Sequence, residues 1–161
     1  MKNKMTEKLF ELAYTDSMTE VQNRNAYEER LKKLRKPNAN ISRITVIVVD
    51  VNGLKEINDS YGHFCGDDAI KTVAKALRDT IGTKADIYRI GGDEFVCISE
   101  SNVLPYISQF KDTIYFINNE KLYNLSVSIG YSRFHEKYSK VIDDIICRAD
   151  EKMYMDKKSK K

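Results

Sequence analysis

The residues best suited to chemistry lie at positions 89–95, which read RIGGDEF. Short apolar runs flank this segment, so it predicts a β-hairpin with its glycines at the tip. Neighbouring side chains of a regular strand point to opposite faces, but Gly91 and Gly92 permit backbone angles closed to other residues. Asp93 and Glu94 could then face one point and bind Mg²⁺ or Mn²⁺ carrying phosphates, because these hard cations prefer oxygen ligands. On this segment alone, a polar hairpin tip that happens to be acidic explains the pattern equally well.

Another carboxylate lies near the end of a predicted buried strand. Residues 44–51 read ITVIVVDV, a β-branched run typical of a strand that is buried on both faces. A buried carboxylate such as Asp50 is unfavourable there without a partner. A cation bound jointly by Asp50, the Val51 carbonyl and the acidic tip would be such a partner. An EF-hand loop starting at Asp50 is excluded, because Gly53 falls at the fourth position instead of the sixth and Tyr61 replaces the final glutamate.

Further motifs give the chain a resemblance to the GGDEF domain, the catalytic domain of bacterial diguanylate cyclases, which join two GTP into cyclic di-GMP. The resemblance spans nearly the whole chain, and the motifs follow the family's order and spacing. They are residues 14–19 with Asn23 and Arg24, residues 50–52 with Lys55, residues 58–59 and 61–67, the GGDEF motif at 91–95, residues 128–130, and Ala149, Asp150, Tyr154 and Lys157.

Hydrophobic periodicity and turn residues predict the elements that must position these motifs. Helices are expected at residues 5–12, 25–34, 54–60, 67–81, 104–110 and 141–154. Strands are expected at 44–51, in the hairpin, at 115–117 as an edge strand and at 125–134 as a central strand. This order predicts an α/β sandwich with a mixed, largely antiparallel central sheet flanked by helices and the GGDEF motif on a hairpin. The resemblance implies the sandwich of nucleotide cyclases and polymerase palm domains.

The chain length predicts one domain. We expect a single GGDEF domain over residues 1–161, in which residues 1–13 are the end of a linker helix from an upstream sensory or regulatory domain. No apolar stretch approaches the roughly 20 residues of a membrane helix, and the N-terminus lacks a signal-peptide pattern. The cysteines Cys65, Cys97 and Cys147 are widely separated and odd in number, which indicates reduced thiols in a cytoplasmic protein.

The net charge of +3 comes from one end of the chain, because four lysines among the last five residues contribute +4 and leave −1 for the rest. A nucleic-acid-binding protein more often spreads Lys and Arg over a face and places aromatic residues among them. We therefore expect no nucleic-acid partner.

The resemblance implies a metal-dependent reaction in which a ribose 3′-hydroxyl attacks an α-phosphate and pyrophosphate leaves. The implied ligands of Mg²⁺ (or Mn²⁺) are Asp50, the Val51 carbonyl, Asp93 and Glu94. Asp93 matches the family's catalytic acid, which assists deprotonation of the hydroxyl, and Glu94 is assigned to catalysis beside it. The implied phosphate-binding residues are Lys55, Lys157 and Lys161.

Asn58 and Asp67 match the family's guanine-reading pair. A carboxylate accepts hydrogen bonds from N1 and N2 of guanine, whereas adenine has no donor there, so Asp67 favours GTP over ATP. Asp67 could also be the N-cap of the helix predicted at 67–81. His63 is expected to be structural, because no nucleophile or second base is its neighbour in sequence.

Other residues support the site or depart from the family pattern. Asp16, Arg24 and Arg89 are expected to form a scaffold of ionic contacts near it. Glu20 stands where many members have glycine, which predicts a strained or altered turn, and Asp156 replaces the usual alanine.

Two departures concern binding of phosphate and of product. Lys161 replaces an arginine and cannot make the same bidentate phosphate contact. The family's product-inhibition motif needs arginine at position 82 and aspartate at position 85, whereas this chain has Gly82 and Ala85, so that motif is absent.

The leading interpretation is an active diguanylate cyclase that works across a transient two-fold homodimer. The alternative is a catalytically inactive GTP-binding or protein-interaction GGDEF module. Inactive members usually alter the GGDEF tip or the strand-end aspartate, and this chain keeps both.

Overall fold

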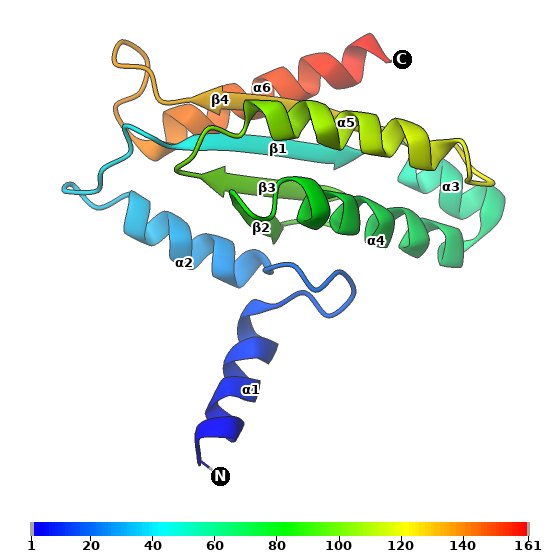
Figure 1. Ribbon diagram of the computed structural model, residues 1–161, viewed down its shortest axis with the longest axis horizontal. Coiled ribbons are helices and arrows are strands. Elements are labelled where there is room, and N and C mark those ends of the chain that lie inside the picture. The colour runs from blue at the N-terminus through cyan, green and yellow to red at the C-terminus, as the bar shows by residue number, and fades with distance from the viewer. Residues whose placement is uncertain (1, 161) are drawn as a thin grey trace.

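The protein is built around a four-stranded sheet (Figure 1). The computed structural model describes residues 2–160, with side chains from residue 5 onward. The strands are β1 (Thr45–Val51), β2 (Asp86–Arg89), β3 (Glu94–Ser99) and β4 (Val127–Arg133), in the order β2-β3-β1-β4. Every ladder between these strands is antiparallel, and an isolated bridge between Gln22 and Tyr88 is parallel. The predicted α/β fold with a largely antiparallel sheet is confirmed.

β1 lies between β3 and β4 and is buried at every position. Its β-branched side chains alternate between the two faces, with Ile47 and Val49 in one apolar cluster and Val46 and Val48 in the other. This arrangement confirms the prediction of a strand buried on both faces. Asp50 is the buried carboxylate within it.

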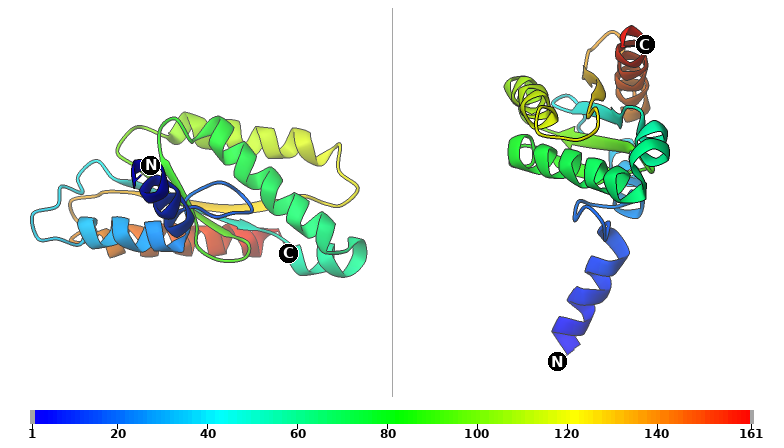
Figure 2. Two further views of the ribbon diagram at one scale, coloured as in Figure 1. Left: turned by 90° about the horizontal axis from the view of Figure 1, so that it is seen from below. Right: turned by 90° about the vertical axis from the view of Figure 1, so that its right-hand side faces the viewer.

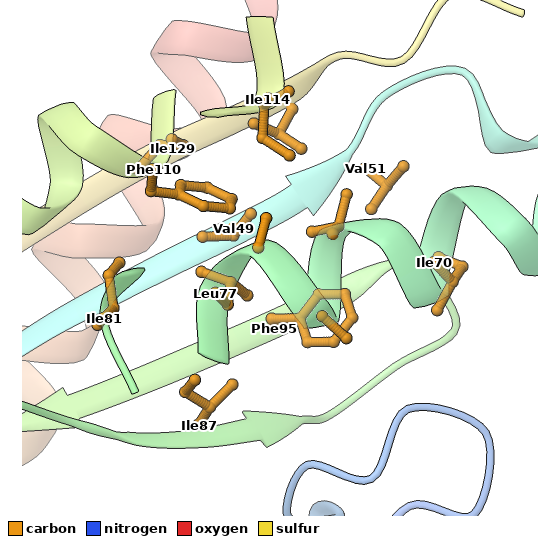
Figure 3. Close-up of a cluster of buried hydrophobic side chains, with 14 of the residues drawn as sticks. Val49, Val51, Ile70, Leu77, Ile81, Ile87, Phe95, Phe110, Ile114 and Ile129 are labelled. Carbon is orange, nitrogen blue, oxygen red and sulfur yellow. The ribbon is translucent and has the colours of Figure 1, made fainter. Parts of the chain in front are cut away.

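Helices cover both faces of the sheet (Figure 2). α4 (His63–Thr80) and α5 (Leu104–Asn118) pack on one face, where Leu77 and Phe110 contact the cluster that contains Val49 and Phe95 (Figure 3). α2 (Arg24–Leu34) and α6 (Ile142–Ser159) pack on the other. The two clusters hold the strands in place from both sides.

Two further helices lie outside these layers. α3 (Leu54–Tyr61) directly follows β1, and Gly62 connects it to α4. α1 (Lys2–Tyr14) projects from the body of the protein (Figures 1 and 2). Its side chains Met5, Leu9, Phe10 and Leu12 are 60–71% exposed. No helix in the described part of the chain combines the length and apolar character that a membrane span requires.

Some predicted elements were wrong. Residues 115–117 belong to the last turns of α5 and form no edge strand. The spacing of Ile107, Phe110, Ile114 and Ile117 continues one helical face into the core, and this packing overrides the local β-propensity. β4 lies at an edge of the sheet, not at its centre.

The start of α4 also differs from the prediction. α4 begins at His63, and Gly62 is its N-cap residue. Asp67 therefore lies in the second turn of α4 and is not an N-cap.

Candidate active site

Asp50 and Glu94 are neighbours across the β1–β3 ladder. They are direct Cα partners in the antiparallel register, so their side chains lie on the same face of the sheet. Strand alternation places Asp50 on the face of Val48 and Glu94 on the face of Val96, the face that α2 and α6 cover. The carboxylates of the two predicted motifs are therefore next to each other.

The hairpin tip is attached to the end of β1. The Val51 amide donates to the Asp93 carbonyl at 2.9 Å, and the Ile90 amide donates to the Glu94 carbonyl at 3.0 Å. Because the N–H and C=O groups of one strand residue leave by the same edge, the Val51 carbonyl also faces the tip. Asp50, Val51, Asp93 and Glu94 thus meet at one end of the sheet.

Lys157 on α6 contacts Asp50, one of these carboxylates. Its Nζ lies 2.7 Å from Oδ1 of Asp50, and the Asp50 side chain is only 7% exposed. This contact supplies the partner that a buried carboxylate requires. A predicted phosphate-binding lysine and a predicted metal ligand therefore form an ion pair.

The site carries more negative than positive charge. Burial raises the pKa of Asp50, and Asp93 adds to this rise while the hydrogen bond from Lys157 opposes it. Burial, Asp93 and Asp50 together raise the pKa of Glu94. The hydrogen bond to Asp50 in turn raises the pKa of Lys157. Lys157 offsets part of the repulsion among these carboxylates.

The donors at this end of the sheet fit a hard divalent cation. Asp50 and Glu94 are adjacent carboxylates and the Val51 carbonyl faces the same tip, so every donor is oxygen, as Mg²⁺ and Mn²⁺ prefer. Within residues 2–160, no group of three or more His, Cys, Asp or Glu side chains is arranged to hold a metal ion. The site can thus offer two carboxylates and a carbonyl, and Mg²⁺ commonly takes its other ligands from water and phosphate.

Arg89 braces the hairpin tip. Its Nη1 lies 3.2 Å from Oδ2 of Asp16, and its Nη2 donates to the Gly92 carbonyl at 2.8 Å. Burial raises the pKa of Asp16, but hydrogen bonds from Thr19 and Arg89 bring it below its usual value. The predicted Asp16–Arg89 scaffold is confirmed.

Arg24 contacts the tip differently from the prediction. Its Nη1 donates to the Ile90 carbonyl at 3.4 Å, so the contact is to backbone and is not an ion pair.

Glu20 adopts a left-handed backbone conformation with φ of 62°, which confirms the expectation of a strained turn. Its carboxylate accepts a hydrogen bond from Arg78 Nη1 at 2.7 Å. The side chain thus gains one exposed ion pair in a conformation that favours glycine.

The guanine-reading candidates lie on adjacent helices. Asn58 is on α3, and Asp67 is exposed in the second turn of α4. A Cβ atom added to Gly66 would lie 1.9 Å from Oδ1 of Asn58. Gly66 therefore allows Asn58 to lie against α4 beside Asp67. Sequence reasoning assigned Gly66 no role, although a glycine inside a helix is a recognisable signal.

Asp68 has a structural role. Its Oδ2 accepts hydrogen bonds from Lys121 Nζ and Tyr123 Oη, both at 2.6 Å. Burial raises the pKa of Asp68, but these two hydrogen bonds hold it below its usual value. Asp68 thus fastens the segment before β4 to the start of α4.

The structure describes one of the two remaining phosphate-binding candidates, Lys55. Lys55 is exposed in the first turn of α3. α3 begins after Gly53, which has φ of 64° and provides no side-chain cap, so no capping side chain covers its first N–H groups. Lys161 lies outside the described residues. A cavity of about 410 Å³ beside α3 has Lys157 and Lys160 in its lining.

The sequence matches a known protein family and curated relatives. The family model "Diguanylate cyclase, GGDEF domain" matches residues 13–161. The chain is 31% identical over 153 residues to "Probable diguanylate cyclase DgcI" of Escherichia coli. The aligned region covers 94% of this chain and 33% of that protein. The chain therefore spans about a third of that relative's length.

Solved structures share the fold. The coiled coil and GGDEF domain of DgcB from Caulobacter crescentus, in complex with c-di-GMP, has a TM-score of 0.80 at 22% identity, covering 98% of this chain and 87% of that one. Diguanylate cyclase SiaD from Pseudomonas aeruginosa, in complex with its activator SiaC, also has a TM-score of 0.80, at 21% identity. The match covers 99% of this chain and 64% of the SiaD chain.

Proposed function

The chain belongs to the family of diguanylate cyclase GGDEF domains, and on this premise we propose that it condenses two GTP into cyclic di-GMP with release of pyrophosphate. The observation that carries the proposal is the pairing of Asp50 and Glu94 at the base of an intact GGDEF tip, with Lys157 beside them. This arrangement places acidic oxygen donors and a cation at one end of the sheet.

Asp50, the Val51 carbonyl and Glu94 would hold Mg²⁺ or Mn²⁺, and Asp93 would complete the ligand set when a cation draws the three carboxylates together. A bound cation of this kind supplies Lewis-acid stabilisation of the phosphates and activates the attacking oxygen. Asp93 assists removal of the proton from the ribose 3′-hydroxyl, and Glu94 lies beside it. Burial and the neighbouring charges of Asp93 and Asp50 raise the pKa of Glu94, and a bound cation would relieve this crowding of negative charge.

Positive groups around the carboxylates receive the phosphates. Lys157, within reach of Asp50, provides a compact charge beside them. The first turn of α3 offers backbone N–H groups, and Lys55 stands in the same turn. Lys161, next in sequence to Lys160, is assigned to the same task.

The base is read by Asn58 and Asp67. Gly66 brings Asn58 against α4, so an amide and a carboxylate stand on facing helices. A carboxylate accepts from both N1–H and N2–H of guanine, and adenine offers neither donor. GTP is therefore the proposed substrate.

The product contains two 3′-to-5′ bonds, so two chains must face each other, each presenting the hydroxyl of its own GTP to the other's phosphate. A transient homodimer around a two-fold axis meets this requirement. Met5, Leu9 and Leu12 of α1 are exposed at spacings of four and three residues, a pattern typical of a helix that pairs with another helix.

We assign residues 1–161 to a single GGDEF domain in the cytoplasm. We also propose that α1 continues a linker from an upstream sensory or regulatory domain. Rate per protein should rise with protein concentration, because catalysis needs two domains.

Product formation tests the proposal. Purified protein, fused to a dimerising coiled coil, is incubated with GTP and Mg²⁺ or Mn²⁺, and cyclic di-GMP and pyrophosphate are quantified by chromatography. ATP in place of GTP, and addition of a chelator, should each abolish product. GTP binding without any product from folded protein would favour the inactive GTP-binding module instead.

A further inference from the structure

The last turns of α6 are hydrogen-bonded to the free edge of β4. Asp156 Oδ2 accepts from the Ile129 amide at 2.8 Å, and Lys160 Nζ donates to the Val127 carbonyl at 2.7 Å. Asp156 and Lys160 also pair with each other at 2.7 Å, one helical turn apart. Within residues 2–160, β1 is the strand that pairs with β4, so these side chains satisfy backbone groups on its other edge.

This attachment lies beside the candidate active site. Val127 and Ile129 flank Ser128, which is the Cα partner of Asp50 in the β1–β4 ladder. Lys157 follows Asp156 directly in sequence and reaches Oδ1 of Asp50. The same helical turn therefore contacts β4 through Asp156 and β1 through Lys157.

A second contact fixes α6 one to two turns earlier. A Cβ atom added to Gly130 would lie 2.0 Å from the Ala149 carbonyl oxygen and 2.1 Å from the Met153 amide nitrogen. The helix backbone thus touches β4 at Gly130, and Asp156 and Lys160 hold the turns that follow. Two attachments along one helix fix its rotation about its axis, and this rotation determines where Lys157 points.

We propose that Asp156 and Lys160 form a clamp on β4 that positions Lys157 for the phosphates of the bound nucleotide. The inference rests on the proposed function of Lys157. Asp156 and Lys160 are positioning residues, since they act through the helix and through Lys157. An alanine at position 156 would lack the acceptor for the Ile129 amide.

The charge of Asp156 suits this role. Burial raises its pKa, but hydrogen bonds from Lys160 and the Ile129 amide bring the pKa below its usual value, so the carboxylate stays ionised at neutral pH. An ionised acceptor makes a stronger hydrogen bond to a backbone amide than a neutral one.

The test compares Asp156→Ala with Asp79→Ala. Asp79 pairs with Lys75 at the same four-residue spacing on α4, but both side chains are exposed and 57–68% accessible. The first readout is the acylation rate of Lys157 by acetic anhydride, followed by mass spectrometry without nucleotide. We expect Asp156→Ala to raise this rate about threefold or more, because a loosened helix frees Lys157 from Asp50, and Asp79→Ala to leave it unchanged.

The second readout is steady-state kinetics. The KM for GTP should rise about fivefold in Asp156→Ala while kcat changes less than twofold, since the clamp affects positioning of the phosphate-binding lysine. Asp156→Asn retains an acceptor for the Ile129 amide and should restore most of the wild-type KM. If Asp156→Ala does not fold, Lys160→Met, which removes the donor to Val127, takes its place.

An unchanged Lys157 acylation rate in the clamp variants would overturn the inference, and so would a loss of stability with no change in KM. The acylation readout needs no enzymatic activity. If the wild-type protein makes no cyclic di-GMP, the proposed function fails while the acylation comparison still decides on the clamp.

Discussion

Nζ of Lys157 lies 2.7 Å from Oδ1 of Asp50, and this contact joins α6 to the end of the central strand. The proposal assigns the two residues to different ligands, Lys157 to phosphate and Asp50 to a metal ion. Under this proposal, Lys157 would compete with the metal ion for the same carboxylate oxygen. The consequences of this competition can be measured.

Lys157→Met should change the affinities for nucleotide and for metal in opposite directions. GTP binding should weaken by about tenfold or more because a phosphate-binding charge is lost. Binding of Mn²⁺ alone should strengthen because Asp50 loses a competing cation. Calorimetry measures both affinities, and Lys158→Met, at an exposed neighbour that lies over the Tyr154 ring, is the control. A parallel loss of GTP and Mn²⁺ affinity would contradict the competition.

Asp67→Ala should weaken GTP binding by about 1–3 kcal/mol, because guanine donors would lose their acceptor. Asp79→Ala on the same helix, roughly 18 Å further along, should leave binding unchanged. Asp68→Ala is unsuitable as a control for binding, because Asp68 accepts hydrogen bonds from Lys121 and Tyr123 and its loss should lower the stability of the fold. Calorimetric titration with GTP checks the prediction, and equal losses from Asp67→Ala and Asp79→Ala would remove Asp67 from the guanine site.

Glu20→Gly should raise the free energy of unfolding by up to about 2 kcal/mol. A left-handed conformation costs a non-glycine residue about 1–2 kcal/mol, and loss of the exposed Arg78 ion pair offsets about 0–1 kcal/mol of this gain. Urea denaturation measures the change. A destabilised Glu20→Gly variant would show that the contact with Arg78 outweighs the backbone strain.

Glu94→Gln should stabilise the protein at neutral pH. Folding raises the pKa of Glu94 above its ordinary value. At a pH between the ordinary and the raised pKa, the folded state therefore binds more protons than the unfolded state. The contribution of Glu94 to stability therefore falls as pH rises through this window, and the unfavourable charge remains above it. Urea denaturation of both proteins from pH 4 to 8 should show that the free energy of unfolding declines less with rising pH in the variant. Identical pH profiles would show that the charge of Glu94 does not destabilise the folded protein.

Much of the fold was predictable because the strongest signals are local. The β-branched run around Val48 predicted the buried strand, and the apolar residues around Asp93 and Glu94 predicted the hairpin. The strand expected at 115–117 failed because the helical face of Ile114 and Ile117 packs into the core, which local propensity does not reveal.

Some contacts between distant residues were not predictable from patterns along the chain. Lys157 and Asp50 are 107 residues apart in sequence, and their contact depends on how α6 crosses the sheet. The same holds for Asp156 and Ile129 and for Asp68 and Tyr123. Motif spacing identified candidate residues, but only the packing of the helices shows which of them meet.

The most direct test of the account is cyclic di-GMP formation by the wild-type protein and by Asp50→Asn, with Asp79→Asn as the control. Asp50→Asn keeps the shape of the side chain and removes one charge from the pair with Glu94. We expect product from the wild-type protein and from Asp79→Asn. Folded Asp50→Asn should lose activity by about a hundredfold or more, as expected when a group that stabilises transition-state charge is removed. Full activity of Asp50→Asn, or no product from any folded protein with GTP and Mg²⁺ or Mn²⁺, would contradict the account.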